Sequence, residues 1–203
     1  MDEIILIGAG GHARACIDVI ELAGTYKIAG LVAKDEADFN ENIGYPIIGT
    51  DKDLPDLRRN YKLAIVAVGQ IKSAATRIRL FNKLNDLKYE LPVIISPRSY
   101  VSSNCKIGAG TMIMHDVMVS TKVKVGNNCI INNKALIEHD TIVGDHCHIA
   151  TAAIINGNIT IGNKAFIGAG VVTKQGISIG SSCTIGLGVV LKNNLAPNQV
   201  IKN

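Results

Sequence analysis

Aliphatic residues recur at every sixth position along the second half of the chain. A period of six fits neither the 3.6-residue repeat of a helix nor the two-residue alternation of a simple strand. It is typical of a parallel β-helix, in which each short strand sends one aliphatic side chain inward before the chain turns a corner. Only Thr173 departs from the series, and its side chain is also β-branched. The anchor positions are Ile95, Val101, Ile107, Ile113, Val119, Val125, Ile131, Ile137, Val143, Ile149, Ile155, Ile161, Ile167, Thr173, Ile179, Ile185 and Leu191.

A second series of small or β-branched residues lies four positions after each anchor, as a narrow corner requires. Its members run from Ser99 through Cys129, Cys147 and Ala165 to Val189. Glycine often follows the anchor directly and asparagine comes next, which we interpret as residues that tolerate left-handed turns. Three hexads complete one triangular coil, so the series from residue 95 to residue 191 predicts between five and six coils.

The first part of the chain has a different pattern, that of a small α/β domain with a parallel sheet. We expect strands at 4–7, 27–32, 63–68 and 89–95 and helices from the glycine turn to Gly24 and over 73–87. The segment 34–57 is expected to hold a short extra strand or turn and a short helix. The predicted organisation is a Rossmann-like domain at 1–92, a hexapeptide β-helix at 93–192 and a C-terminal tail at 193–203.

A glycine-rich turn, Gly8-x-Gly10-x-x-Ala13, follows the first predicted strand and opens a helix. Bare backbone at a helix N-terminus can bind an anion such as a phosphate. Gly69 ends another predicted strand at the same edge of the sheet, where ligands collect in parallel α/β folds. The pair favours a nucleotide or nucleotide sugar, and the alternative is a tight turn without a ligand. A nicotinamide dehydrogenase is disfavoured, because fewer than 100 residues precede the coils and it needs a second half-sheet.

Histidines beside carboxylates are the candidate chemical groups of the second domain. His139 lies between Glu138 and Asp140, and His148 follows on the next turns. A neutral imidazole can accept a proton near pH 7, and a neighbouring carboxylate can fix its tautomer. The alternatives are an exposed polar turn and a zinc site of the carbonic anhydrase type, whose histidine spacing these positions do not match.

Composition and charge narrow the function classes. The net charge of +4 is not concentrated in a run, and no zinc-finger spacing or aromatic stacking set appears, so nucleic-acid binding is not expected. The opening segment does not resemble a signal peptide and no apolar stretch could cross a bilayer, so we expect a soluble cytoplasmic protein without membrane contact. The five cysteines have no CxxC spacing and are expected to be reduced.

These motifs together resemble the sugar acyltransferases of the sialic acid O-acetyltransferase and bacillosamine-pathway N-acetyltransferase group. The resemblance rests on GAGGHA near the start and on NNKALIEHDTIVGDHCHIATAAIINGNITIG from Asn132 to Gly162. It implies a left-handed β-helix, a homotrimer with active sites between subunits, acetyl-CoA as cosubstrate and no metal.

The resemblance also implies roles for single residues. His139 would be the general base and Asp140 its acidic partner, in direct transfer without an acyl-enzyme. The acetyl-CoA site would contain His148, Gly157, Ala169 and Leu187. The sugar-substrate site would contain Gly10, Gly11, His12, Asp35, Gly69, Arg77 and Asn132.

The sequence does not assign the molecule that accepts the acetyl group. Val32-Ala33-Lys34-Asp35 departs from the acidic residues usual after the second strand, so the nucleotide is not assigned. We expect acetylation of an amine or hydroxyl on a nucleotide-activated amino-sugar or a sialic-type acid in glycan biosynthesis. The alternative is a non-enzymatic β-helix partner of a glycan-pathway enzyme.

Overall fold

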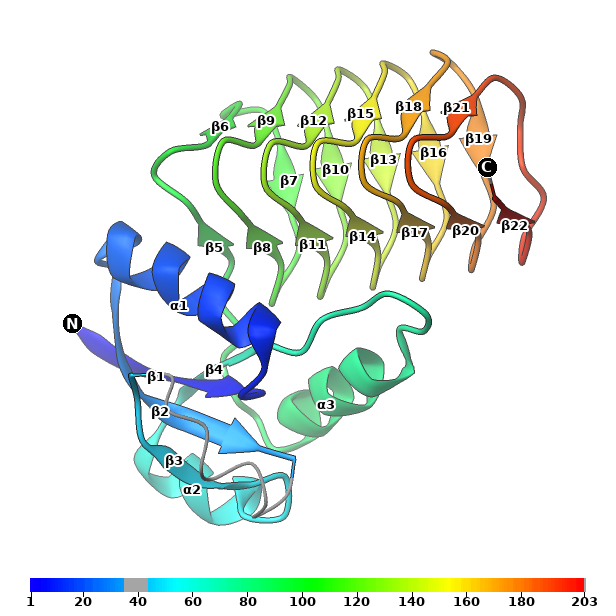
Figure 1. Cartoon of the computed structure of the whole chain (residues 1–203). Helices are drawn as coiled ribbons and strands as arrows, with labels where there is room; N and C mark the ends of the chain where they lie inside the picture. Colours follow the sequence, from blue (N-terminus) through cyan, green and yellow to red (C-terminus); the bar gives the residue numbers. More distant parts are fainter. Residues whose placement is uncertain (35–43, 203) are drawn as a thin grey trace.

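The computed structural model describes residues 1–34 and 44–202, arranged as an α/β domain beside a β-helix (Figure 1). Asp35, one of the predicted substrate residues, lies outside the described residues. None of the helices in the described ranges is long and apolar enough to span a membrane.

The N-terminal domain is a four-stranded parallel sheet with the strand order β3-β2-β1-β4. Its elements are β1 (Asp2–Ile7), α1 (Gly11–Ala23), β2 (Tyr26–Ala33), β3 (Ile47–Thr50), α2 (Leu54–Asn60), β4 (Leu63–Val66) and α3 (Ala75–Asp86). The predicted α/β class is therefore confirmed, and β3 and α2 are the short strand and short helix expected between 34 and 57.

The strand predicted at 89–95 is wrong for most of its length. Lys88 turns the chain with a φ of 62°, and only one bridge, Leu63 to Glu90, joins this segment to the domain sheet. Pro92 has no N–H to donate to a ladder. The regular strand starts only at Ile94 and belongs to the β-helix.

The β-helix is a triangular prism of two-residue parallel strands, which we divide into three faces. Face A contains β5 (Ile94–Ile95), β8 (Met112–Ile113), β11 (Ile130–Ile131), β14 (His148–Ile149), β17 (Phe166–Ile167), β20 (Thr184–Ile185) and β22 (Val200–Ile201). Face B contains β6 (Tyr100–Val101), β9 (Met118–Val119), β12 (Leu136–Ile137), β15 (Ile154–Ile155), β18 (Val172–Thr173) and β21 (Val190–Leu191). Face C contains β7 (Lys106–Ile107), β10 (Lys124–Val125), β13 (Ile142–Val143), β16 (Thr160–Ile161) and β19 (Ser178–Ile179).

The inward positions are those that the hexad pattern predicts. Anchors from Ile113 onward and the second-series residues from Thr111 onward are buried, and Thr173 is 1% exposed. Ile95 differs, with 38% of its surface exposed, because it begins the first coil and no coil lies below it. The predicted tail adds one more strand, since β22 pairs with β20 and Leu195 packs against the core.

Turn geometry corrects one interpretation of the glycines. Left-handed residues recur every six positions from Gly110 to Gly188, and most of them are Asn, Asp, Lys, His or Ser. The glycines that directly follow an anchor are not left-handed. A Cβ on Gly108 would lie 2.5 Å from the carbonyl carbon of Gly126, so these positions need glycine because successive coils approach closely.

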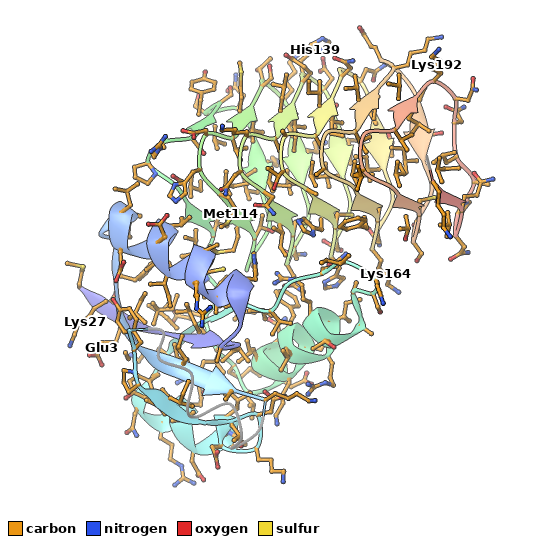
Figure 2. The ribbon with its side chains drawn as sticks, viewed as in Figure 1. Glu3, Lys27, Met114, His139, Lys164 and Lys192 are labelled. Atoms are coloured by element: carbon orange, nitrogen blue, oxygen red, sulfur yellow. The ribbon has the colours of Figure 1, made fainter. Side chains whose placement is uncertain are left out.

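The N-terminal domain covers most of face A, whereas Val200 of the last strand, β22, is 60% exposed. Outward side chains of this face, Ile94 and Met112, share an apolar cluster with α1, together with Met114 (Figures 1 and 2). Faces B and C carry no other part of the described chain. Three edges separate the faces, and we call them AB, BC and CA after the faces that they join.

Candidate active site

A cavity of about 570 Å³ lies at the carboxyl ends of β1, β2 and β4. Its lining includes the glycine turn from Gly8 to Gly11, together with Gly69. A Cβ on Gly8 would lie 2.9 Å from Val68, whereas open space extends beside Gly10 and Gly11. The α1 N-terminus thus presents bare backbone to a cavity, the arrangement that binds phosphates.

His12 lines the same cavity as a neutral imidazole. Its Nε2 is buried and makes no hydrogen bond among the described residues. Burial lowers the pKa of His12 to about 3, and the charges of Arg77 and His148 act in the same direction. The unpartnered nitrogen is therefore available to a ligand as an uncharged group.

Arg77 does not line the cavity, although it was predicted to contact the substrate. Its side chain is fully buried, with Nη1 donating to the carbonyls of Val66 (2.9 Å) and Val68 (2.6 Å). Its Nη2 donates to Oδ1 of Asn128 in the β-helix at 2.7 Å. Arg77 thus joins the cavity wall to the β-helix, and burial lowers its pKa to about 10.

Three polar or charged residues of the cavity wall were missed in the sequence. They are Asp51, Thr76 and Arg79, and Arg79 contacts Asp51 at 2.8 Å near the end of β2. The Asp51–Arg79 contact joins the turn between β3 and α2 to α3, and no local sequence pattern predicts a contact between residues so far apart. Lys34, noted as the departure from the family's acidic residues, also lines this end of the cavity.

His148 lies on face A with both ring nitrogens engaged. Its Nδ1 lies 2.5 Å from the carbonyl of Gln70, and its Nε2 lies 3.3 Å from Nδ2 of Asn132. Because a carbonyl only accepts, Nδ1 carries the proton and Nε2 is the acceptor. The orientation of the Asn132 amide is consistent with this tautomer. Its Oδ1 accepts the N–H of Asn133 at 2.8 Å, which turns its amide nitrogen towards His148. Burial lowers the pKa of His148, which keeps this ring neutral.

His139 and Asp140 lie on edge BC, in the turn between β12 and β13. Nδ1 of His139 donates to Oδ2 of Asp140 at 2.9 Å, so the neutral ring leaves Nε2 bare. Gly157 lies one coil further along the same edge, and a Cβ there would be 2.6 Å from Nε2 of His139. The Gly157 N–H has no hydrogen-bond partner within the described part of the chain. A candidate base and a residue with a free backbone donor thus lie next to each other on this edge.

One chain does not bring all of the predicted site residues together. Asn132, Ala169 and Leu187 lie at edge AB, with His148 on the adjoining face A; Ala169 and Leu187 are exposed there. His139 and Gly157 lie on the edge opposite face A. Figure 2 accordingly shows His139 on the side of the β-helix away from the N-terminal domain, whereas Met114 is on the near side. The described ranges contain no cluster of three potential metal ligands.

Comparison with known proteins matches both parts of the chain. The PglD N-terminal domain matches residues 3–84, the bacterial transferase hexapeptide (six repeats) matches 104–139, and the hexapeptide repeat of succinyl-transferase matches 158–193. A solved structure of GDP-perosamine N-acetyltransferase from Caulobacter crescentus, a mutant in complex with CoA and GDP-perosamine, is 29% identical with a TM-score of 0.91. The alignment covers 98% of this chain and 93% of that one.

The chain combines a PglD N-terminal domain with hexapeptide repeats and matches the hexapeptide-repeat sugar acyltransferases in both parts. Another similar protein is the acetyltransferase domain of PglB from Neisseria gonorrhoeae in complex with acetyl coenzyme A, which is 29% identical with a TM-score of 0.89, over 98% of this chain and 94% of that one. WeeI from Acinetobacter baumannii has the same fold, with 22% identity, a TM-score of 0.86 and coverage of 98% and 96%. A search of curated proteins returns no match.

Proposed function

We propose that this acyltransferase transfers an acetyl group from acetyl-CoA to the amine of a nucleotide-linked amino-sugar. The observation that carries the proposal is the close approach of His139, held by Asp140, to Gly157, whose N–H is free within the described part of the chain. The glycine turn and the cavity beside it support a nucleotide diphosphate. The similar Caulobacter enzyme, bound to CoA and GDP-perosamine, supports the substrate class.

The proposed chemistry is direct transfer. Nε2 of His139 removes a proton as the sugar amine attacks the thioester carbonyl, and Asp140 stabilises the imidazolium. The Gly157 N–H donates to the oxygen on which negative charge develops. His139 then returns the proton to the leaving thiolate. Neutral His148 accepts at Nε2 from Asn132, so a substrate group that took the place of Asn132 there would be a donor such as the amine rather than the acetyl oxygen.

Face B supports the trimer that the resemblance implies. Its outward side chains are all apolar, in the order Tyr100, Met118, Leu136, Ile154, Val172 and Val190. Tyr100 is 61% and Val190 62% exposed. The outward side chains of face C are instead largely polar, and most of face A is covered by the N-terminal domain. A continuous apolar face of this kind marks an association surface.

A three-fold arrangement would also complete the active site. If the three B faces surround the symmetry axis, edge AB of each chain adjoins edge BC of the next. His139 and Gly157 of one chain then face Asn132, His148, Ala169 and Leu187 of its neighbour. Acetyl-CoA would lie in the groove between the two edges, next to the neighbour's nucleotide cavity.

The test is acetyl-CoA-dependent thiol release with a panel of acceptors. The panel contains GDP- and UDP-linked 4-amino-sugars, sialic acid and its CMP-linked form. We expect turnover with a nucleotide-linked amino-sugar, and a loss of about 10²- to 10⁴-fold in kcat in His139→Ala with CoA binding retained.

Other outcomes would redirect the proposal. Turnover with only a sialic-type acid would make the protein an O-acetyltransferase. No thiol release with any acceptor would favour the non-enzymatic β-helix partner, and a fully active His139→Ala variant would exclude this mechanism.

A further inference from the structure

Thr173 interrupts the aliphatic hexad series one coil beyond the corner that carries Gly157. It occupies an anchor position at the end of β18 on face B and is almost completely buried. A hydroxyl at such a position needs partners, because an unpaired buried polar group is costly. The surrounding hydrogen bonds show which partners it has.

The ladder on face B is otherwise regular. The residue that follows each strand donates its N–H to the anchor carbonyl of the next coil: Glu138 to Ile155 at 2.9 Å, and Lys174 to Leu191 at 2.7 Å. Asn156 is the exception. Its N–H donates to Oγ1 of Thr173 at 3.0 Å, and its side-chain Nδ2 donates to the Thr173 carbonyl at 2.6 Å.

Strand pairing is shortened at the same place. β15 and β18 share a single residue pair, Ile154 with Val172, whereas other neighbouring strands on face B share two. The Thr173 hydroxyl and the Asn156 amide thus take the place of the main-chain hydrogen bond that would join the Asn156 N–H to the Thr173 carbonyl. The main chain after Ile155 is therefore held away from the coil above, and the next residue along it is Gly157.

We infer that Thr173 and Asn156 are positioning residues for acetyl transfer, because together they hold Gly157 against the ring of His139. The inference rests on the proposed function. Neither residue touches the reacting atoms. Both act through the path of the main chain, which sets where the oxyanion donor lies relative to the base.

Thr173→Val should move this corner while keeping the side-chain shape. Valine restores the aliphatic series but has no hydroxyl for the Asn156 N–H. That N–H then lies beside the residue-173 carbonyl, which is the ladder partner used in the other coils. Closing the regular bond would shift Gly157, and a shift of about 1 Å at a reacting centre can cost roughly 100-fold in rate.

The experiment compares Thr173→Val, Thr173→Ser and Thr111→Val. Oγ1 of Thr173 makes two hydrogen bonds, accepting from Asn156 and donating to the Ile154 carbonyl at 3.4 Å. Thr111 is an equally buried threonine whose Oγ1 also makes two, to Gly126 and Cys129, but on edge CA. We expect Thr173→Val to lower kcat about 10- to 100-fold with an unchanged KM for acetyl-CoA. Thr173→Ser should restore kcat, and Thr111→Val should leave it unchanged.

A crystal structure of Thr173→Val provides the measurement that does not depend on activity. We expect Asn156 N–H to bond to the residue-173 carbonyl and Gly157 to be displaced from His139. An unmoved Gly157, wild-type kcat in Thr173→Val, or equal losses in the Ser and Val variants would overturn the inference. If wild-type protein acetylates no acceptor, the proposed function fails, and the displacement of Gly157 still decides the positioning role.

Discussion

Single residues in this chain act through the tautomer that their neighbours impose. His139 donates from Nδ1 to Asp140, which leaves its Nε2 bare, whereas His148 donates from Nδ1 to the Gln70 carbonyl and accepts at Nε2 from Asn132. They differ in solvation: 45% of the His139 side chain is exposed, whereas His148 is buried. An exposed ring can take up and return a proton, whereas a buried neutral ring is suited to hold a donor in place.

Burial of His12 makes the free energy of unfolding fall at acidic pH. The folded protein binds a proton at His12 only near pH 3, whereas the unfolded chain does so near 6.5. The stabilisation is thus complete above pH 6.5 and is lost as the pH falls towards 3. For each unit by which the pH falls across this range, His12 should lower the free energy of unfolding by about 1.4 kcal/mol. Burial lowers the pKa of His146 and His148 too, with the same sign.

Urea unfolding at about pH 7.5, 6.5 and 5.5 would measure this slope at constant protein concentration. His12→Gln should reduce the slope by roughly one proton, since glutamine does not titrate. Thr160→Gln on exposed face C provides the control, because it adds and removes no titrating group and should retain the wild-type slope. An unchanged slope in His12→Gln would contradict the predicted burial of a neutral imidazole.

Elements differ in how far the sequence alone predicts them. The six-residue period places inward residues on every coil, because each strand repeats the same geometry. It does not show what covers an outward face: the contacts of Arg77 with Asn128 and of His148 with Gln70 join residues 51 and 78 positions apart. The role of Gly108 was misread for a similar reason, since its constraint comes from the coil above.

The apolar face B predicts how the chains associate. Met118→Glu together with Leu136→Glu would place two carboxylates on the apolar face and should convert the proposed trimer to monomers, because burying them unpaired is costly. Sedimentation at micromolar concentration measures the change. The matched control, Thr160→Glu on face C, should remain trimeric. Trimers in the face B variant would exclude this face as the contact.

At the scale of the whole molecule, mixing two inactive variants can distinguish an active site shared between neighbouring chains from one formed within a single chain. His139→Ala removes the base. Gly10→Asp places a carboxylate where the phosphate would bind, and the extended backbone of Gly10 at the start of α1 suits aspartate as a helix cap. Each variant alone should be inactive and correctly folded.

Trimers that contain both variants decide between the two arrangements. In any mixed trimer, one intact cavity faces one intact His139 across an interface, whichever variant is in the majority. Doubly tagged mixed trimers should therefore regain about one third of wild-type kcat. If base and cavity acted within one chain, no mixed trimer would contain a complete site and activity would stay at the level of the parents. Mixed trimers of two differently tagged His139→Ala chains should remain inactive, which controls for effects of the tags and of coexpression.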